Sequence, residues 1–181
     1  MALKSTVYKV QLNLADMDRE RYADHAFTLA LHPSETLERL LVRIIAFAWF
    51  ADEDLVFTRG LSSEDEPDLW QKDLTDTILH WMEVGMPDET RIRKGCHRAA
   101  RMTVVTYGDH AAPVWWEKIR SSLTRFENLE VLFLPQAPLE AMTPHMGRNL
   151  SLQITRQDGV LWITLDNLTV ELKPEVWRQA R

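Results

Sequence analysis

Residues 78–85 read Ile78-Leu79-His80-Trp81-Met82-Glu83-Val84-Gly85. This stretch is apolar on nearly both faces, which predicts a strand in the middle of a sheet that is covered on both sides. Periodic apolar residues and turn signals predict the neighbouring elements: a helix over 34–48, strands at 55–58, 104–107 and 129–134, and helices over 87–102 and 112–123. Helices and strands therefore alternate around the central strand, as in a mixed α/β core.

Both ends of the chain show the period of two that is typical of half-buried strands. Apolar and polar residues alternate from Thr6 to Leu14, and His25–Leu31 is predicted to return as the second strand. The same alternation runs from Leu150 to Leu172 around the hairpin signal Asp158-Gly159. We therefore expect an α/β (α+β) protein with a mixed central sheet flanked by helices. The two termini would add antiparallel strands, and the whole chain, 1–181, would form one domain.

Composition excludes several classes of protein. The chain has 181 residues, 45% of them apolar, and a formal net charge of −6, which excludes an overall basic surface for nucleic acid but allows a local basic patch. The single cysteine, Cys96, excludes an internal disulfide, and its helical phase predicts a buried small side chain rather than a nucleophile. No secretory signal or membrane-length apolar run is present, so we expect a cytoplasmic location.

Glu83 is the most informative acidic residue, because it lies within the predicted central strand. A buried carboxylate must be protonated, paired or bound to a metal, since an isolated buried charge is very costly. One interpretation is a functional site. The other is a salt bridge to one of the abundant arginines.

Two further acids could join Glu83. Asp68 ends the acidic run Glu64-Asp65-Glu66-Pro67-Asp68, where the chain re-enters apolar structure at Leu69-Trp70. Two carboxylates at adjacent strands would suit Mg²⁺ or Mn²⁺. On the first helix, with Ser34 as its N-cap, Glu35 points away from the apolar face and should be solvated, whereas Glu38 lies at the edge of that face. The alternative for Glu38 is an ordinary flanking glutamate.

Three basic residues form a stripe on the helix that follows the central strand. Arg91, Lys94 and Arg98 are spaced i, i+3, i+7, within a segment of net charge +3. The stripe could meet a phosphate beside the carboxylates. Alternatively, it is a solvated face opposite the apolar side of the helix.

Long blocks of this sequence resemble the YaeQ family of bacterial proteins, from the Ala2-Leu3-Lys4 start to the Asp158-Gly159 hairpin. The blocks that carry the resemblance are His32-Pro33-Ser34-Glu35-Thr36-Leu37-Glu38-Arg39, Phe57-Thr58-Arg59-Gly60-Leu61, Asp65-Glu66-Pro67 and Trp81-Met82-Glu83-Val84-Gly85-Met86-Pro87-Asp88-Glu89, together with Lys94, Tyr107 and Trp115-Trp116.

The resemblance implies a variant PD-(D/E)XK, restriction-endonuclease-like fold, with an αβββαβ core over about residues 34–134. Pro67-Asp68 then resembles the first half of the nuclease motif, Glu83 its second acid, and Glu38 the acid often found on the first helix. The chain departs from the motif at Gly85, where a lysine is expected. Lys94 on the following helix is the natural replacement, with Arg91 as the other candidate.

These roles define two expected functions. The first is a Mg²⁺-dependent (or Mn²⁺-dependent), nuclease-like protein acting on nucleic-acid phosphodiesters. In it, Asp68 and Glu83 are the metal ligands, Glu38 and Lys94 complete the catalytic set, and Arg91 and Arg98 bind substrate. The second is a non-catalytic protein that keeps the fold and binds nucleic acid or a protein partner. A structural or regulatory role without metal stays open.

Overall fold

The computed structural model describes residues 4–181, so Ala2 and Leu3 of the family-like start lie outside it. The chain forms two compact units. One contains the segment up to Trp49 together with Ala137–Pro174, and the other contains Phe50–Gln136 and Glu175–Arg181. The single domain expected over residues 1–181 stays a prediction, and each unit is described by itself.

The first unit is built on a five-stranded sheet of order β10-β9-β8-β1-β2. Its elements are β1 (Thr6–Asp16), β2 (Arg21–Leu31), α1 (Leu37–Phe50), α4 (Gln136–Met142), β8 (Asn149–Gln157), β9 (Val160–Leu165) and β10 (Leu168–Leu172). The predicted hairpins β1–β2 and β8–β9 are present and antiparallel. Apart from β11 (Glu175–Arg178), which adds an antiparallel strand to the second unit's sheet, the strands of the two ends form a sheet of their own instead of extending the central one, and β1 pairs with β8 in parallel.

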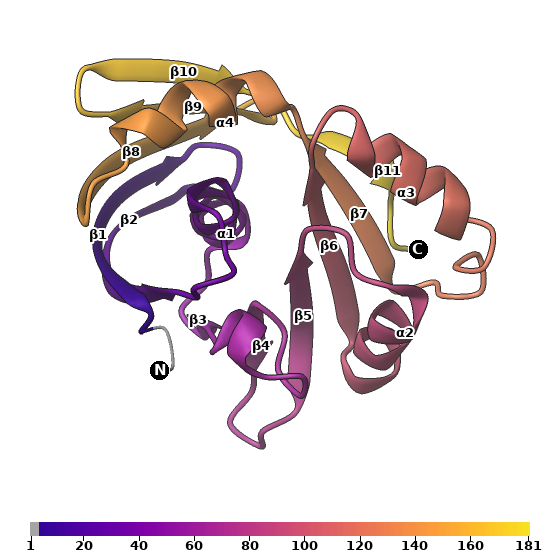
Figure 1. Ribbon diagram of the computed structural model, residues 1–181. Coiled ribbons are helices and arrows are strands. Elements are labelled where there is room, and N and C mark those ends of the chain that lie inside the picture. Colours follow the sequence, from indigo (N-terminus) through magenta and orange to yellow (C-terminus); the bar gives the residue numbers. More distant parts are fainter. Residues whose placement is uncertain (1–3) are drawn as a thin grey trace. The chain divides into compact units, whose positions relative to one another are not determined.

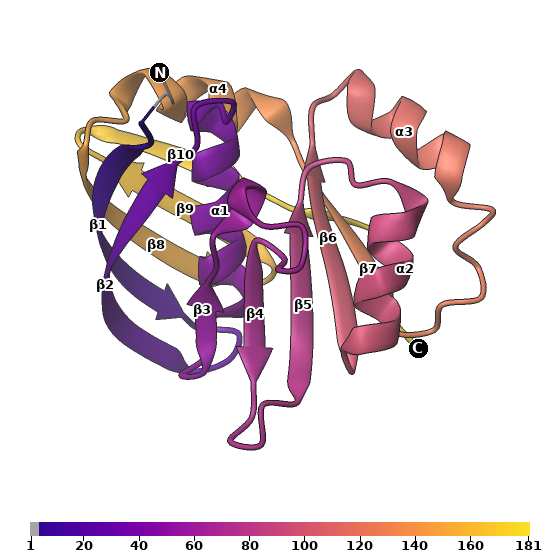
Figure 2. The ribbon, with the colours of Figure 1, turned by 60° about the horizontal axis from the view of Figure 1, so that its bottom comes forward.

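Helix α1 lies against the concave face of this sheet (Figures 1 and 2). It contributes a nearly continuous buried run from Leu40 to Ala48. Phe47 packs on Phe27 of β2, with ring centroids 5.2 Å apart. The buried helix therefore packs against the five-stranded sheet and supplies much of the apolar core of the first unit.

Two expectations about the start of α1 are wrong. The N-cap is not Ser34: the Thr36 hydroxyl accepts a hydrogen bond from the Arg39 amide at 3.1 Å, and the helix begins at Leu37. Glu35 is buried, not solvated, and pairs with Arg39 at 2.9 Å and with Arg43 at 3.2 Å. Because Glu35 precedes the helix, the helical phase does not set its direction.

The second unit is built on a six-stranded sheet of order β11-β7-β6-β5-β4-β3. Its elements are β3 (Leu55–Phe57), the 3-10 helix η1 (Gly60–Ser62), β4 (Leu69–Lys72), β5 (Ile78–Val84), α2 (Glu89–Arg98), β6 (Arg101–Tyr107), α3 (Ala111–Ile119), β7 (Leu129–Leu134) and β11 (Glu175–Arg178). β5, β6 and β7 are parallel, while β3, β4 and β5 pair antiparallel. β5 is thus an interior strand, as predicted.

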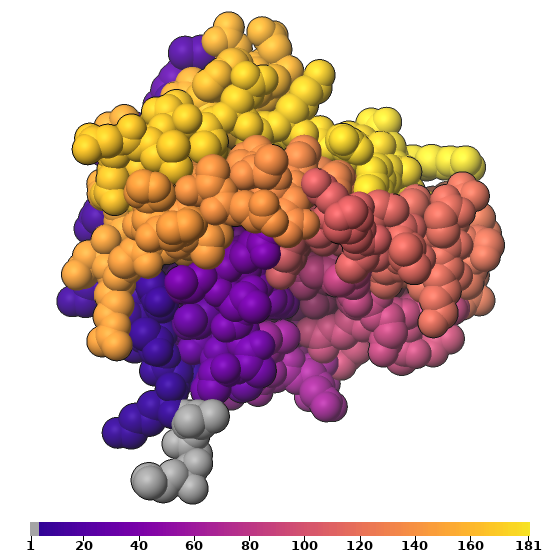
Figure 3. Space-filling model, turned by 45° about the horizontal axis from the view of Figure 1, so that its top comes forward, coloured from indigo at the N-terminus to yellow at the C-terminus, as the bar shows by residue number. Residues whose placement is uncertain are grey.

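Helices α2 and α3 lie on the same side of this sheet (Figure 1). Beneath them Trp81, Ile92 and Met102 are fully buried in one core. The aromatic rings of α3 and β11 border this core: Trp116 lies 6.4 Å from Trp177, and the two segments adjoin on the surface in Figure 3.

Helix α2 is shorter than predicted and ends at Arg98. Ala99 is extended, and Ala100 already donates a backbone hydrogen bond to Ile78 of β5. The Asn128 side chain donates to the carbonyls of Cys96 and Ala99 at 2.9 and 3.0 Å, which satisfies the end of the helix. Met102, predicted to lie in the helix, therefore belongs to β6.

The mixed α/β class is confirmed, and residues 34–107 contain the expected order of helix, three strands, helix and strand as α1, β3, β4, β5, α2 and β6. The elements without a predicted range are β4, α4, β11 and the 3-10 helices η1 and η2 (Thr143–His145), all of seven residues or fewer. Between residues 4 and 181, no helix is long and apolar enough to cross a membrane.

Gly95 shows how closely α2 packs on the sheet. A Cβ atom at this position would lie 2.5 Å from Met102 Sδ and 2.9 Å from Trp81 Cδ1. An alanine in a helix normally stabilises by about 1 kcal/mol relative to glycine. Here we expect Gly95→Ala to destabilise the protein by about 1–3 kcal/mol, because the rigid Trp81 ring cannot move aside.

Urea unfolding measures this difference, and Gly147→Ala is the matched control. A Cβ at Gly147 meets no atom within 4 Å, so that variant should be neutral or slightly stabilised. Equal stability of the two variants would contradict the close packing of α2.

Candidate functional site

Asp68 and Glu83 lie close together at the end of β5 in the second unit. Asp68 directly precedes β4, whose first residue, Leu69, pairs with Met82 of β5. The Asp68 carboxylate accepts a hydrogen bond from the amide of Val84, the residue after Glu83, and its charge acts on Glu83. Both side chains are buried, with residue exposures of 2% and 5%. The structure therefore brings together the two acids that the sequence singles out.

Glu83 is held by neighbours on its own strand and on α2. Its Oε1 atom accepts hydrogen bonds from Trp81 Nε1 at 2.8 Å and Arg91 Nε at 2.7 Å. Burial and the nearby Asp68 charge nevertheless raise the pKa of Glu83 to about 7, against the opposing effect of Arg91. The salt bridge to an arginine, one of the two sequence interpretations, is thus present, and it exists beside a second carboxylate.

Asp68 is fixed by the backbone at the entrance to β4. Its amide donates to the Met82 carbonyl at 3.0 Å, and its Oδ2 accepts a hydrogen bond from the Val84 amide at 2.8 Å. Asp68 is therefore bound to the end of β5 through both its backbone amide and its carboxylate.

The donor set of this pair fits a hard divalent cation with few protein ligands. Both hydrogen bonds described for Glu83 end on Oε1, which leaves Oε2 as its oxygen for a cation. Among residues 4–181, no group of three or more His, Cys, Asp or Glu side chains is arranged to hold a metal. Mg²⁺ commonly uses one or two carboxylates and completes its shell with water and phosphate oxygens, so two carboxylates suffice.

Glu38 lies in the first unit, at the start of α1. Its carboxylate is half-buried, and its Oε1 has no hydrogen-bond partner among the described residues. Burial and the neighbouring Glu140 raise the pKa of Glu38 above its ordinary value. Its role as a third catalytic acid stays a prediction.

The basic stripe binds the acidic loop that precedes β4. Lys94 Nζ donates to Asp65 Oδ1 at 2.9 Å and to the Glu64 carbonyl at 3.0 Å. Arg91 donates to the carbonyls of Glu64 and Glu66, and Arg98 donates to the Asp65 carbonyl at 3.4 Å. Hydrogen bonding and the charge of Lys94 lower the pKa of Asp65. The sequence did not predict this contact, although the opposite charges of the two segments are visible in it.

Gly85 occupies the position at which the nuclease motif has a lysine, and the space around it is unobstructed. Gly85 follows Glu83 by two residues and has φ +105°, and a Cβ built there meets no atom within 4 Å. Its amide donates to the Val105 carbonyl at 2.9 Å. An L side chain is strained at this φ, which gives a backbone reason for glycine at the motif position.

The opposite face of the sheet carries a buried polar chain that sequence reasoning missed. His80 Nε2 hydrogen-bonds Thr103 Oγ1 at 2.7 Å, and that hydroxyl lies 3.2 Å from Glu130, which also pairs with Arg101. Burial and Arg101 lower the pKa of His80 to about 3, so the imidazole is neutral near neutral pH. The three polar residues come from β5, β6 and β7, so only the sheet order reveals the chain.

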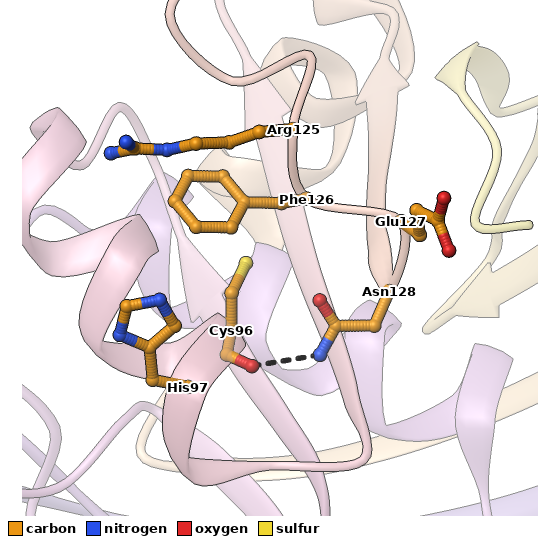
Figure 4. Close-up of a pocket in the computed structure, with 6 residues that line it drawn as sticks. All are labelled: Cys96, His97, Arg125, Phe126, Glu127 and Asn128. Carbon is orange, nitrogen blue, oxygen red and sulfur yellow. Dashed lines mark hydrogen bonds between the residues drawn. The ribbon is translucent and has the colours of Figure 1, made fainter.

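Cys96 is a buried side chain, as predicted. It borders a cavity of about 400 Å³ together with His97, Arg125, Phe126, Glu127 and Asn128 (Figure 4). Burial raises the pKa of its thiol to about 11, so little thiolate exists at neutral pH. This environment is the reverse of the one that activates a nucleophilic cysteine.

The raised pKa of Glu83 predicts an unusual dependence of stability on pH. Glu83 keeps its proton up to about pH 7 when folded, against an ordinary pKa of 4.5. Between these values the folded state binds more protons than the unfolded state, so this contribution is complete below 4.5 and lost as pH rises through 7. Relative to Glu83→Gln, which does not titrate, wild-type stability should fall by roughly 3 kcal/mol between about pH 4.5 and pH 8.

Urea unfolding of both proteins across this range measures the effect, and the exposed Glu64→Gln variant controls for the loss of one carboxylate. A stability difference between wild type and Glu83→Gln that stays constant with pH would show that Glu83 is ionised throughout.

Comparison with known proteins shows the family to which the chain belongs. The family model described as YaeQ protein matches residues 1–174. The proteins named "Uncharacterized protein YaeQ" from Escherichia coli (strain K12) and Salmonella typhi are each 43% identical over 179 residues, which is 99% of this chain and 99% of theirs.

Two solved structures are similar over nearly the whole chain. The crystal structure of YaeQ protein from Xanthomonas axonopodis pv. citri has a TM-score of 0.91 and 46% identity, and covers 98% of this chain and 99% of its own. That of YaeQ protein from Pseudomonas syringae has a TM-score of 0.92 and 38% identity, and covers 97% of both chains. The resemblance seen in the sequence is thereby confirmed, and the chain belongs to the YaeQ family.

Proposed function

We propose that this protein is a Mg²⁺-dependent, nuclease-like protein that acts on nucleic-acid phosphodiesters. The observation that carries the proposal is the burial of Glu83 close to Asp68, whose carboxylate accepts a hydrogen bond from the Val84 amide next to Glu83. Two buried carboxylates that lie close together repel each other, and burial and the Asp68 charge raise the pKa of Glu83 to about 7. A divalent cation between them would remove the repulsion.

Each residue has a definite task in this proposal. Asp68 and Glu83 hold the cation. When bound, Mg²⁺ lowers the pKa of a coordinated water and neutralises charge on the phosphate. Arg91, whose guanidinium reaches Glu83, orients the phosphodiester beside the carboxylates. Lys94, one helical turn farther along α2, positions the attacking water or stabilises the developing negative charge, and Arg98 extends the contact along the nucleic-acid backbone.

A second candidate function is favoured by the Glu83–Arg91 ion pair. The 2.7 Å contact already supplies one positive charge to Glu83 without metal. A protein that keeps this pair permanently would bind nucleic acid through its stripe and not cleave it. The two functions differ in whether divalent cations bind.

Calorimetric titration with Mn²⁺ and Mg²⁺ tests the metal site. We expect Asp68→Asn and Glu83→Gln to weaken Mn²⁺ binding at least about 100-fold, beyond the roughly 10–100-fold typical of residues that only support metal ligands. The rate of cleavage of single-stranded DNA, duplex DNA or RNA should decrease in the same two variants. Glu64→Gln, which removes a nearby exposed carboxylate, should behave like wild type. Wild type that takes up no Mn²⁺ would overturn the nuclease proposal and favour the binding function.

The dependence of nucleic-acid affinity on salt tests the stripe. Each phosphate contact releases counterions, so the slope of log K against log salt concentration reports the number of contacts. Arg91→Ala, Lys94→Ala and Arg98→Ala should each weaken binding and reduce the slope by about 0.7–0.9. Arg93 is exposed on the same helix, and Arg93→Ala is the matched control. Identical slopes for all four variants would exclude the stripe as the contact surface.

A further inference from the structure

The acidic segment Glu64–Glu66, here called the strap, lies across the basic stripe formed by Arg91, Lys94 and Arg98. All three cations donate to it, and the acceptors are the carbonyls of the three strap residues and the Asp65 carboxylate. The strap therefore presents a row of oxygen atoms to the same donors that would bind phosphate oxygens.

The strap compensates the stripe only in part. It contributes one contacting carboxylate, that of Asp65, and otherwise neutral carbonyl oxygens, against three positive charges, of which only that of Arg91 is also paired with Glu83. A phosphodiester chain carries one negative charge per nucleotide and would satisfy the same donors with stronger, charge-assisted hydrogen bonds. Charge complementarity thus favours exchange of the strap for a nucleic-acid backbone.

The strap is anchored at its ends by the rest of the loop, and its middle is held by the stripe through hydrogen bonds and one exposed ion pair. On one side, Pro67 and Asp68 are buried, and the Thr58 hydroxyl donates to the Pro67 carbonyl. On the other side, Ser63 donates to the Gly60 carbonyl at the end of η1. Between these anchors the only side-chain ion pair described between strap and stripe is Asp65–Lys94, and the Asp65 side chain is 88% exposed. Exposed ion pairs contribute little, so water and competing anions can displace this one.

We propose that the strap is an intramolecular competitor that occupies the nucleic-acid contact surface of α2 until the phosphodiester backbone of a nucleic acid displaces it. This inference rests on the stripe being the nucleic-acid surface of the proposed function. Binding then requires the open strap, so the apparent Kd exceeds the intrinsic Kd by the inverse of the open fraction. The strap also covers Lys94, so its release is a condition for Lys94 to reach a substrate.

Two variants with the same change in charge test the competition. Asp65→Asn removes the carboxylate that Lys94 binds, while Glu64→Gln removes a carboxylate from the adjacent residue, whose contact with the stripe is through its carbonyl. Fluorescence anisotropy with an oligothymidylate of about 15 nucleotides should give a Kd for Asp65→Asn about 3–10-fold lower than for Glu64→Gln, as expected if the strap is closed most of the time.

Hydrogen exchange of the segment between Thr58 and Asp68 gives an independent readout of strap position. Adding the oligothymidylate to wild type should accelerate exchange in this segment and slow it in α2. Equal Kd values for the two variants, or slower exchange in the strap, would overturn the competition and make the strap part of the binding surface. Absence of binding by wild type and Asp65→Asn would overturn it too.

The strap and the proposed function fail in distinguishable ways. Tighter binding by Asp65→Asn with no Mn²⁺ uptake supports the strap and overturns cleavage. Mn²⁺ uptake by wild type, with equal oligonucleotide affinities for Asp65→Asn and Glu64→Gln, supports the metal site and overturns the strap.

Discussion

The second unit depends on the burial of one carboxylate, that of Glu83, on the helix-covered face of an interior strand. An acid at 5% exposure in an apolar core must find partners. Glu83 finds two, the indole of Trp81 on its own strand and the guanidinium of Arg91 on α2. The second contact ties the first turn of α2 to β5, above the core in which Gly95 packs directly on Trp81.

The same guanidinium connects the site to the acidic loop. Arg91 donates to Glu83 through Nε and to the loop carbonyls through its terminal nitrogens, so one planar side chain joins β5, α2 and the segment before β4. Only an arginine has enough donors in a rigid fork to make all these contacts at once. The carboxylate pair, the basic stripe and the strap therefore form one electrostatic unit, and a change in any of them alters the charge balance of the others.

Asp68 and Arg91 have opposite effects on the pKa of Glu83. The Asp68 charge raises the pKa of Glu83, while backbone amides hold Asp68 in place. The result is a buried glutamate whose pKa is raised by burial and by a second acid and lowered by one arginine. Perturbed carboxylates of this kind cluster at functional sites, although structural ion pairs also produce them.

Much of this could be predicted from residue patterns. Alternation identified β1 and β8, the apolar run at 78–85 identified the interior strand β5, and a carboxylate within that run identified Glu83 as an acid that needs partners. These features are local, because the spacing of apolar residues within one strand can be read without knowing the rest of the chain. Asp68 was placed at the same site because it stands where the chain re-enters apolar structure at Leu69-Trp70, and the resemblance of Pro67-Asp68 to the nuclease motif agreed with that placement.

Only the tertiary structure decided which elements meet. The parallel pairing of β1 with β8 and the separate terminal sheet join residues more than a hundred positions apart, for which the strand pattern is the same in either arrangement. Glu35 was misjudged because it lies before the helix, so the fold rather than helical phase directs it toward Arg43. The strap on the stripe and the chain from His80 to Glu130 depend on side chains from different elements. The sequence determines which groups need partners. The packing of distant segments determines which residues become those partners, because the need for an opposite charge or a hydrogen bond can be met by any suitable residue in the chain.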